Sequence, residues 1–425
     1  MSAFFHREWL RLLGVLVGYA VLMGTNPVRH SLLDGFRAMR RYRRLWAIPA
    51  ALGLCYALFH ACVTLFLFAV QPADLQPAFA WRFNWSIPPW SSSLAETHSL
   101  RDWLSVFFAD PRWQALRAAG LEGLESLAGL FNNVVTTFPF SAVAAALLLV
   151  NWQNHHRTLF RALRKRFGRW GWAIHAGILA CALSAILEPI LLSPVLIYLN
   201  RVAPGFLLVR WGCLIDWFSN LFGYMFGVGV QVYLILLVYT WLRGLTWKPV
   251  HLMDMAIRRF SIVVKWAALV MGFTALLIDL PRIFALLFLF DDPLHIKHTF
   301  LYLDRVARPL LALLLIFFSS MQITLTFHSE TLTKAFAHHW QFLRRFWWPL
   351  LWYLLIAGIH LFGLAFLHRW LLLGFGGDGT AAGLLLSSLF PLVAAVLAAW
   401  LLASWVSFYK RTETGRTQAP DWIAF

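Results

Sequence analysis

Eight uninterrupted apolar runs constrain this chain more than any other feature. Most hold about 20 residues or more, the length that an α-helix needs to cross the hydrocarbon core of a bilayer. The runs lie at 45–70, 128–150, 170–187, 215–242, 261–280, 310–327, 347–367 and 384–408. The sequence therefore predicts an all-α fold, a polytopic transmembrane bundle of about eight spans paired into four hairpins.

Charge and aromatic content agree with a membrane protein. Only 13% of the residues are charged, against about 25% in soluble proteins, and 60% are hydrophobic. The net charge of +17 is divided among short runs between apolar stretches, which is unlike the basic surface of a nucleic-acid-binding protein. Most Lys and Arg fall on one side of the predicted spans, which by the positive-inside rule is the cytoplasm. We expect a bacterial inner membrane protein with a cytoplasmic C-terminal tail, 410–425.

The chain is expected to form a single membrane domain, 1–425. Its N-terminal part, 1–44, combines a short apolar run with a basic stretch. The apolar run at 12–23 is short for a span, so it is interpreted as an interfacial or obliquely inserted helix; a ninth span is the alternative.

A basic amphipathic stretch precedes every second span. These stretches cover 33–44, 158–169, 251–265 and 332–345. Each is predicted to lie as a helix in the headgroup plane, either as a topological anchor or as a binder of anionic headgroups at the cytoplasmic face. Anionic membrane lipids are thus the first expected partner class, and protein subunits of a larger complex are the second.

The unit of basic helix, span and return span repeats four times. Three return spans end in Tyr or His with Arg, at Asn154-His155-His156-Arg157, Tyr239-Thr-Trp-Leu-Arg243 and Tyr409-Lys-Arg411. This arrangement resembles uncharacterised bacterial membrane proteins related to the membrane domain that is attached to some glycerophosphodiester phosphodiesterases. The sequence shows no phosphodiesterase catalytic domain, so the resemblance implies no such activity here.

A segment rich in Trp, Pro and Ser, 71–127, separates the first two spans. It is predicted to form an extracytoplasmic cap in which two short helices begin at 99–102 and at Asp110-Pro111, because each place has an N-capping pattern. The cap either closes an outward cavity or is purely structural.

Polar residues recur on one face of the fourth span. The series, at spacings of three and four residues, is Gly212, Asp216, Asn220, Gly223, Gly227 and Gln231. Intramembrane polar groups usually face the bundle interior, so Asp216, Asn220 and Gln231 are candidate binding residues. The alternative is that they only hold helices together.

Five further ionisable residues are candidates. Glu188 ends the third span, while Asp279 and Arg282 end the fifth, at equivalent places of the repeat. His60 and His360 lie near the middles of the first and seventh spans. They either form a relay or each satisfy one hydrogen bond to a neighbouring helix.

Catalytic and cofactor motifs are missing from the sequence. It contains no GxxxxGK[ST], HExxH or GxSxG pattern, and we expect no metal or cofactor. The favoured function is non-enzymatic binding or movement of a lipid or other amphiphile. A structural subunit of a larger membrane complex is the first alternative, and an intramembrane enzyme acting on a lipid headgroup is the second.

Overall fold

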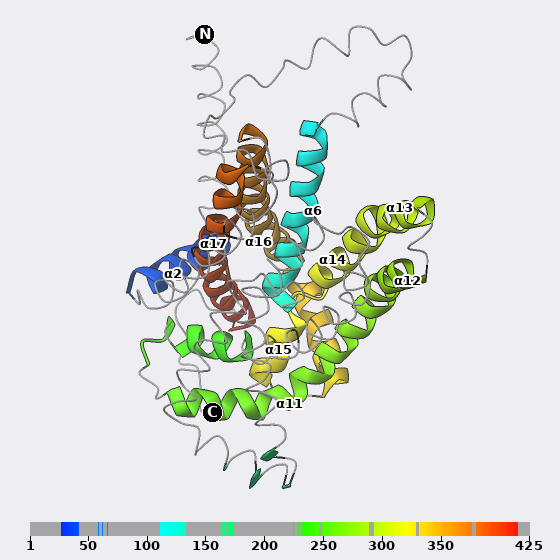
Figure 1. Ribbon diagram of the computed structural model, residues 1–425. Coiled ribbons are helices and arrows are strands. Elements are labelled where there is room, and N and C mark those ends of the chain that lie inside the picture. The colour runs from blue at the N-terminus through cyan, green and yellow to red at the C-terminus, as the bar shows by residue number, and fades with distance from the viewer. Residues whose placement is uncertain are drawn as a thin grey trace, which may run out of the picture.

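A computed structural model describes just over half of the chain, and every regular element in that part is helical (Figure 1). The helices are connected into a bundle in which segments far apart in the sequence pack together. The described residues are 27–41, 58, 62, 66, 111–132, 161, 164–165, 168–169, 171–172, 224, 228, 231–240, 242–245, 249–288, 293–328, 331–375 and 380–414.

Within the described residues, three helices are long and apolar enough to cross a membrane. They cover Asp254–Phe288, Leu294–His328 and Leu332–Gly374. These helices confirm the prediction of a multi-pass α-helical membrane protein. The count of eight spans in four hairpins stays a prediction, because the runs at 45–70 and 170–187 lie mostly outside the described residues.

The fifth predicted span and the basic stretch before it form one continuous helix. Helix α11 (Pro249–Thr274) runs into a π-turn, η3 (Ala275–Asp279), and then into α12 (Leu280–Phe288). Pro281 has no N–H and its ring would clash with a carbonyl in the preceding α-turn, so the wider π-turn lets the helix continue. Arg282 lies on α12, one turn beyond Asp279.

The sixth span begins with a π-turn of the same kind. Helix α13 (Pro293–Tyr302) continues through η4 (Leu303–Ala307) into α14 (Arg308–Phe317), which carries Pro309 in its first turn. The two π-turns lie side by side, and α12 and α13 form an arm that extends away from α6 and α16 (Figure 1). A turn at 318–320 then separates α14 from α15 (Met321–His328).

Helix α16 (Leu332–Gly374) joins the last basic stretch to the seventh span. It has 43 residues, about 64 Å of helix at 1.5 Å per residue, roughly twice the thickness of the hydrocarbon core. Phe346 has non-helical backbone angles, three residues before Pro349, so the helix kinks between the predicted interfacial stretch and the predicted span.

The last span lies in α17 (Ala381–Thr414), and α2 (Pro27–Arg41) packs along its lower half (Figure 1). Val28, Leu32 and Met39 of α2 are buried. The apolar face of this helix thus meets α17 rather than acyl chains, which differs from a helix lying free in the headgroup plane.

Helix α6 (Pro111–Asn132) stands between α14 and α16. Its start at Pro111 agrees with the predicted N-terminal signal, but it is one long helix that crosses the predicted boundary between the cap and the second span. Leu127 and Phe131 are buried in the core against other helices. The predicted helix start at 99–102 lies outside the described residues.

Candidate functional site

Helices α6 and α14 run parallel and in register. Arg308 contacts Glu125, and the backbone oxygen of Leu315 contacts Asn132, so both contacts join residues 183 apart in the sequence. Seven residues separate the two contacts along each helix, which is about two turns and returns each chain to the same face. Polar groups therefore line this helix pair over two turns.

Charged groups form the upper end of this line in the view of Figure 1. The Arg308 guanidinium donates from Nε to Glu125 Oε1 at 2.5 Å and from Nη2 to Glu125 Oε2 at 2.6 Å, and its Nη1 contacts Asp304 at 3.0 Å. Three residues earlier on α6, Glu122 pairs with Arg369 of α16 at 3.3 Å. The two carboxylates thereby link α6 to helices on both sides.

The turn between α14 and α15 exposes a backbone carbonyl that α6 satisfies. The Ser319 N–H donates to the Ile316 carbonyl at 3.1 Å, so it does not reach Leu315 as it would in a regular α-helix. The Asn132 side chain donates to the Leu315 oxygen at 2.7 Å instead. The Trp266 indole N–H donates to Asn132 Oδ1 at 3.2 Å and holds the amide in this orientation.

A second amide chain adjoins the broken helix. Gln231 Nε2 donates to the carbonyl of Leu130 at 2.8 Å, and Gln322 Nε2 donates to Gln231 Oε1 at 3.1 Å. Gln231, a residue predicted from sequence, is therefore inside the bundle, where it joins its own helix, Gln231–Thr240, to α6 and α15.

Several buried polar atoms near the turn have no hydrogen-bond partner within the described part of the chain. They are Gln322 Oε1, Ser319 Oγ and His339 Nε2. The other ring nitrogen of His339 lies 2.6 Å from Ser320 Oγ. Buried polar groups are ordinarily satisfied, so these atoms mark a place where a polar group of another molecule or a water can bond.

The lower end of the line is aromatic and basic. Thr324 Oγ1 lies 2.7 Å from the Tyr409 hydroxyl, and the Lys410 ammonium lies 3.8 Å from the centre of the Phe327 ring. Tyr239 packs edge-on against the same Phe327 ring. The ends of the fourth, sixth and eighth spans therefore meet here, including two of the three motifs that the repeat singled out.

We call this whole line of polar contacts the polar seam. It runs from the ion pairs of Glu122 and Glu125, past the amides at the α14–α15 turn, to Tyr409 and Lys410. It joins α6, α14, α15, α16, α17 and the helix Gln231–Thr240 through side chains that bond across helices rather than within them. Its middle is uncharged and its ends carry charge.

The other candidate residues take different places. His360 Nδ1 bonds the carbonyl of Ile356 in its own helix at 2.7 Å, and its ring packs on Trp400. Asp279 and Arg282 lie at the η3–α12 junction of the arm. The remaining candidates lie outside the described residues: Asp216, Asn220, Glu188 and His60.

Sequence reasoning missed most of the seam. Asn132 and Gln322 are polar residues inside predicted spans, the same signal that selected Gln231, and a uniform search for that signal would have found both. Glu125 and Arg308 lie just outside the predicted spans and gave no such signal. Their pairing depends on the register of α6 against α14.

Neither metal chemistry nor homology adds to this site. In the described ranges, His, Cys, Asp and Glu side chains form no group of three that could hold a metal ion. No family model matches the chain, and neither a curated protein nor a solved structure matches it. The resemblance drawn from the repeat pattern therefore stays a prediction.

Proposed function

We propose that this protein is a non-enzymatic integral membrane protein that binds a lipid or other amphiphile and moves its headgroup along the polar seam. The observation that carries the proposal is the broken sixth span with its unpartnered buried polar atoms. Irregular backbone at membrane depth is tolerated where it is buried in protein or lines a path, and broken helices commonly mark binding sites in transporters.

The polarity of the seam supports this function. A headgroup that enters the hydrocarbon core loses its bonds to water, which costs several kcal/mol per unsatisfied group by order of magnitude. Amide, hydroxyl and imidazole groups such as those of Gln322, Ser319 and His339 offer replacement bonds, while acyl chains remain outside in lipid. Charged groups at both ends suit the entry and exit of a polar headgroup.

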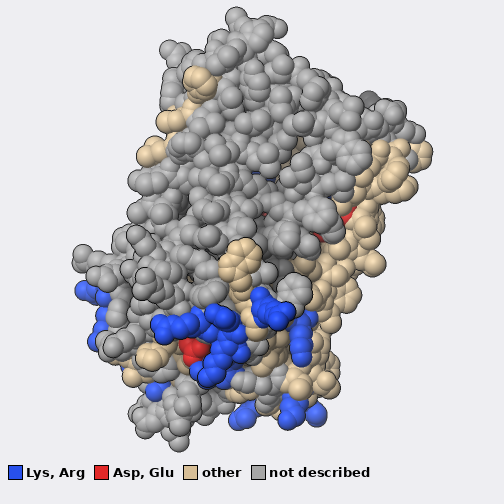
Figure 2. Space-filling view, turned by 60° about the horizontal axis from the view of Figure 1, so that its bottom comes forward, with Lys and Arg blue, Asp and Glu red and all other residues tan. Residues whose placement is uncertain are grey.

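The proposed orientation places the lower end of Figure 1 in the cytoplasm of a bacterial cell. Figure 2 shows Lys and Arg gathered at that end, which supports the positive-inside assignment from the sequence. The C-terminal tail and α2 then lie at the cytoplasmic face, and the arm of α12 and α13 lies toward the outside.

The test is retention of lipid by a variant with an apolar seam. Gln231→Leu with Gln322→Leu removes both partners of one bond, so neither side chain leaves an orphaned amide behind. We expect native mass spectrometry of the purified protein to show at least tenfold less of the lipid that co-purifies with the wild type. The protein should still unfold cooperatively.

The matched control is Thr240→Val with Thr274→Val. Both hydroxyls bond carbonyls of their own helices, at 2.7 Å and 3.0 Å, and lie away from the amide chain. This control should retain lipid like the wild type. Equal lipid retention by the seam variant would overturn the proposal.

A second function, a subunit of a larger membrane complex, is favoured by one observation. The arm exposes a row of large apolar side chains that no described helix covers: Phe273, Leu276, Leu280, Phe284 and Phe288. Mass spectrometry of the protein released from its own membranes distinguishes the two functions, since a stoichiometric protein partner supports the subunit and a lipid adduct alone supports the carrier.

A further inference from the structure

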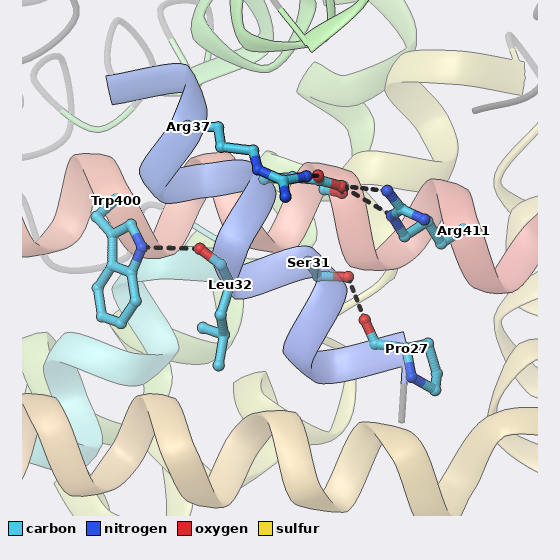
Figure 3. Close-up of polar contacts among 8 residues, drawn as sticks. Pro27, Ser31, Leu32, Arg37, Trp400 and Arg411 are labelled. Carbon is cyan, nitrogen blue, oxygen red and sulfur yellow. Dashed lines mark hydrogen bonds and ion pairs between the residues drawn. The ribbon is translucent and has the colours of Figure 1, made fainter. Parts of the chain in front are cut away.

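Helix α2 is fixed to α17 by a polar clasp (Figure 3). Asp34 accepts from Arg411 Nε at 2.8 Å and Nη2 at 2.6 Å, and the Ser407 hydroxyl donates to the same carboxylate oxygen at 2.8 Å. Trp400 Nε1 donates to the Leu32 carbonyl at 3.2 Å. These bonds hold α2 in one orientation about its own axis.

A close approach of the two backbones reinforces this orientation. A Cβ atom added to Gly35 would lie 3.0 Å from the Ser404 nitrogen and 3.0 Å from the Trp400 oxygen, so only glycine fits. The buried residues of α2 all lie on the side of Gly35, as the burial of Val28, Leu32 and Met39 shows. The apolar side of the helix is therefore fully used by α17.

The opposite side of α2 combines cations with large apolar side chains. At about 100° per residue, the outward residues fall within an arc of roughly 100°. They are Arg29, Leu33, Phe36, Arg37 and Arg40. Phe36 is 60% exposed and the Arg37 side chain is 74% exposed.

The carboxylate of α2 does not neutralise this outward side. Asp34 lies between the two faces, is only 16% exposed and is held by Arg411 at 2.6 Å, whereas Arg37 is 3.7 Å from it. The outward arc therefore presents three guanidinium groups around Phe36 and Leu33. A partner for this surface must be both anionic and apolar.

We propose that the outward face of α2 binds anionic phospholipid, with the guanidinium groups of Arg29, Arg37 and Arg40 on headgroup phosphates and with Phe36 and Leu33 among the upper acyl chains. This inference goes beyond the carrier function and does not rest on it. A second copy of the chain fits this surface less well, because a twofold contact between two such faces would oppose arginine to arginine. The face also belongs to the end of the molecule where Lys and Arg gather (Figure 2).

The test compares lipid binding by the full-length protein in zwitterionic detergent. Phosphatidylglycerol and phosphatidylethanolamine are titrated separately, and bound lipid is counted by native mass spectrometry. Each arginine near a headgroup contributes about a fivefold change in affinity. Arg37→Gln with Arg40→Gln should therefore weaken phosphatidylglycerol binding by about 25-fold to 30-fold and leave phosphatidylethanolamine binding unchanged.

The matched control removes two cations from the other end of the molecule. Lys297→Gln with Arg305→Gln changes two exposed residues on the α13–α14 segment and should leave phosphatidylglycerol binding at the α2 face intact. Phe36→Ser tests the apolar part of the face and should weaken binding without changing its preference for anionic lipid.

Three outcomes would overturn the proposal. The first is equal phosphatidylglycerol binding by the wild type and the α2 arginine variant. The second is an equal loss in the Lys297 and Arg305 control. The third is conversion of a dimer to a monomer by the α2 variant with lipid binding unchanged, which would make the face an interface between copies. Lipid retention by the seam variant is measured separately, so failure of either proposal is distinguishable from failure of the other.

Discussion

The polar seam and the arm of α11 to α13 differ in where their polar side chains bond. In the seam, side chains bond across helices, as Asn132 does to Leu315 and Glu125 to Arg308. In the arm, they bond within their own helix, as Thr274 does to Val270 and Thr299 to His295. Both regions belong to long apolar helices, so hydropathy does not distinguish them.

This difference separates two uses of polar residues in a membrane helix. A bond to a neighbouring helix fixes the register of the pair and loses its partner when the helices separate. A bond to the helix's own carbonyl satisfies the hydroxyl wherever the helix goes, so it carries no tertiary information. The seam is therefore expected to determine stability and binding, and the arm to tolerate change.

The largest effect is expected from Asn132→Leu. This change leaves the Leu315 carbonyl and the Trp266 indole N–H without their partners inside the bundle, which should cost about 3 kcal/mol of unfolding free energy. Unfolding by sodium dodecyl sulfate, followed by circular dichroism, measures it. Trp266→Phe, which spares the bond to Leu315, should cost less, and an equal or greater loss there would contradict the role given to Asn132.

A smaller loss is expected from Glu125→Gln. It replaces a two-point ion pair, in which Glu125 is 18% exposed, by a neutral amide opposite the Arg308 guanidinium, at a cost of about 2 kcal/mol. Glu122→Gln in the same helix is the control. Its contact with Arg369 is single, longer and more exposed, so its loss should stay below about 1 kcal/mol. Reversal of this order would remove the distinction between the two pairs.

Two glycines of α6 sharpen the comparison at the level of packing. A Cβ at Gly123 would lie 3.0 Å from Phe362 Cα, so Gly123→Ala should force α6 and α16 apart and cost about 1–2 kcal/mol. A Cβ at Gly120 meets only a ring atom at 3.9 Å, and Gly120→Ala should be neutral or stabilising. Thermal unfolding in detergent distinguishes them, and equal losses would show that the crossing is not tight.

The smallest effect is expected in the arm. Thr274→Val and Thr299→Val each remove only a bond to a carbonyl of the same helix, so each should change the unfolding free energy by less than about 0.5 kcal/mol. The same detergent unfolding assay applies. A loss as large as that of Asn132→Leu would mean that the arm is held as firmly as the seam.

The sequence predicted the features that depend on local chemistry. Hydropathy located the long helices because crossing the hydrocarbon core needs a run of apolar residues whatever its neighbours are. The kink at Phe346 follows from the proline at 349, and the start of α6 follows from Pro111. Gln231 was found because a polar residue inside a span must bond within the protein.

Tertiary structure decided which residues meet. Asn132 and Leu315 are 183 residues apart, and nothing in either local sequence encodes the other. The sequence of α2 showed an amphipathic helix, but only the packing against α17 showed that its apolar face is buried in protein and that its arginine face is turned outward. The physical reason is that lipid and a neighbouring helix are equally apolar, so a hydrophobic pattern reports that a face avoids water and does not report what covers it.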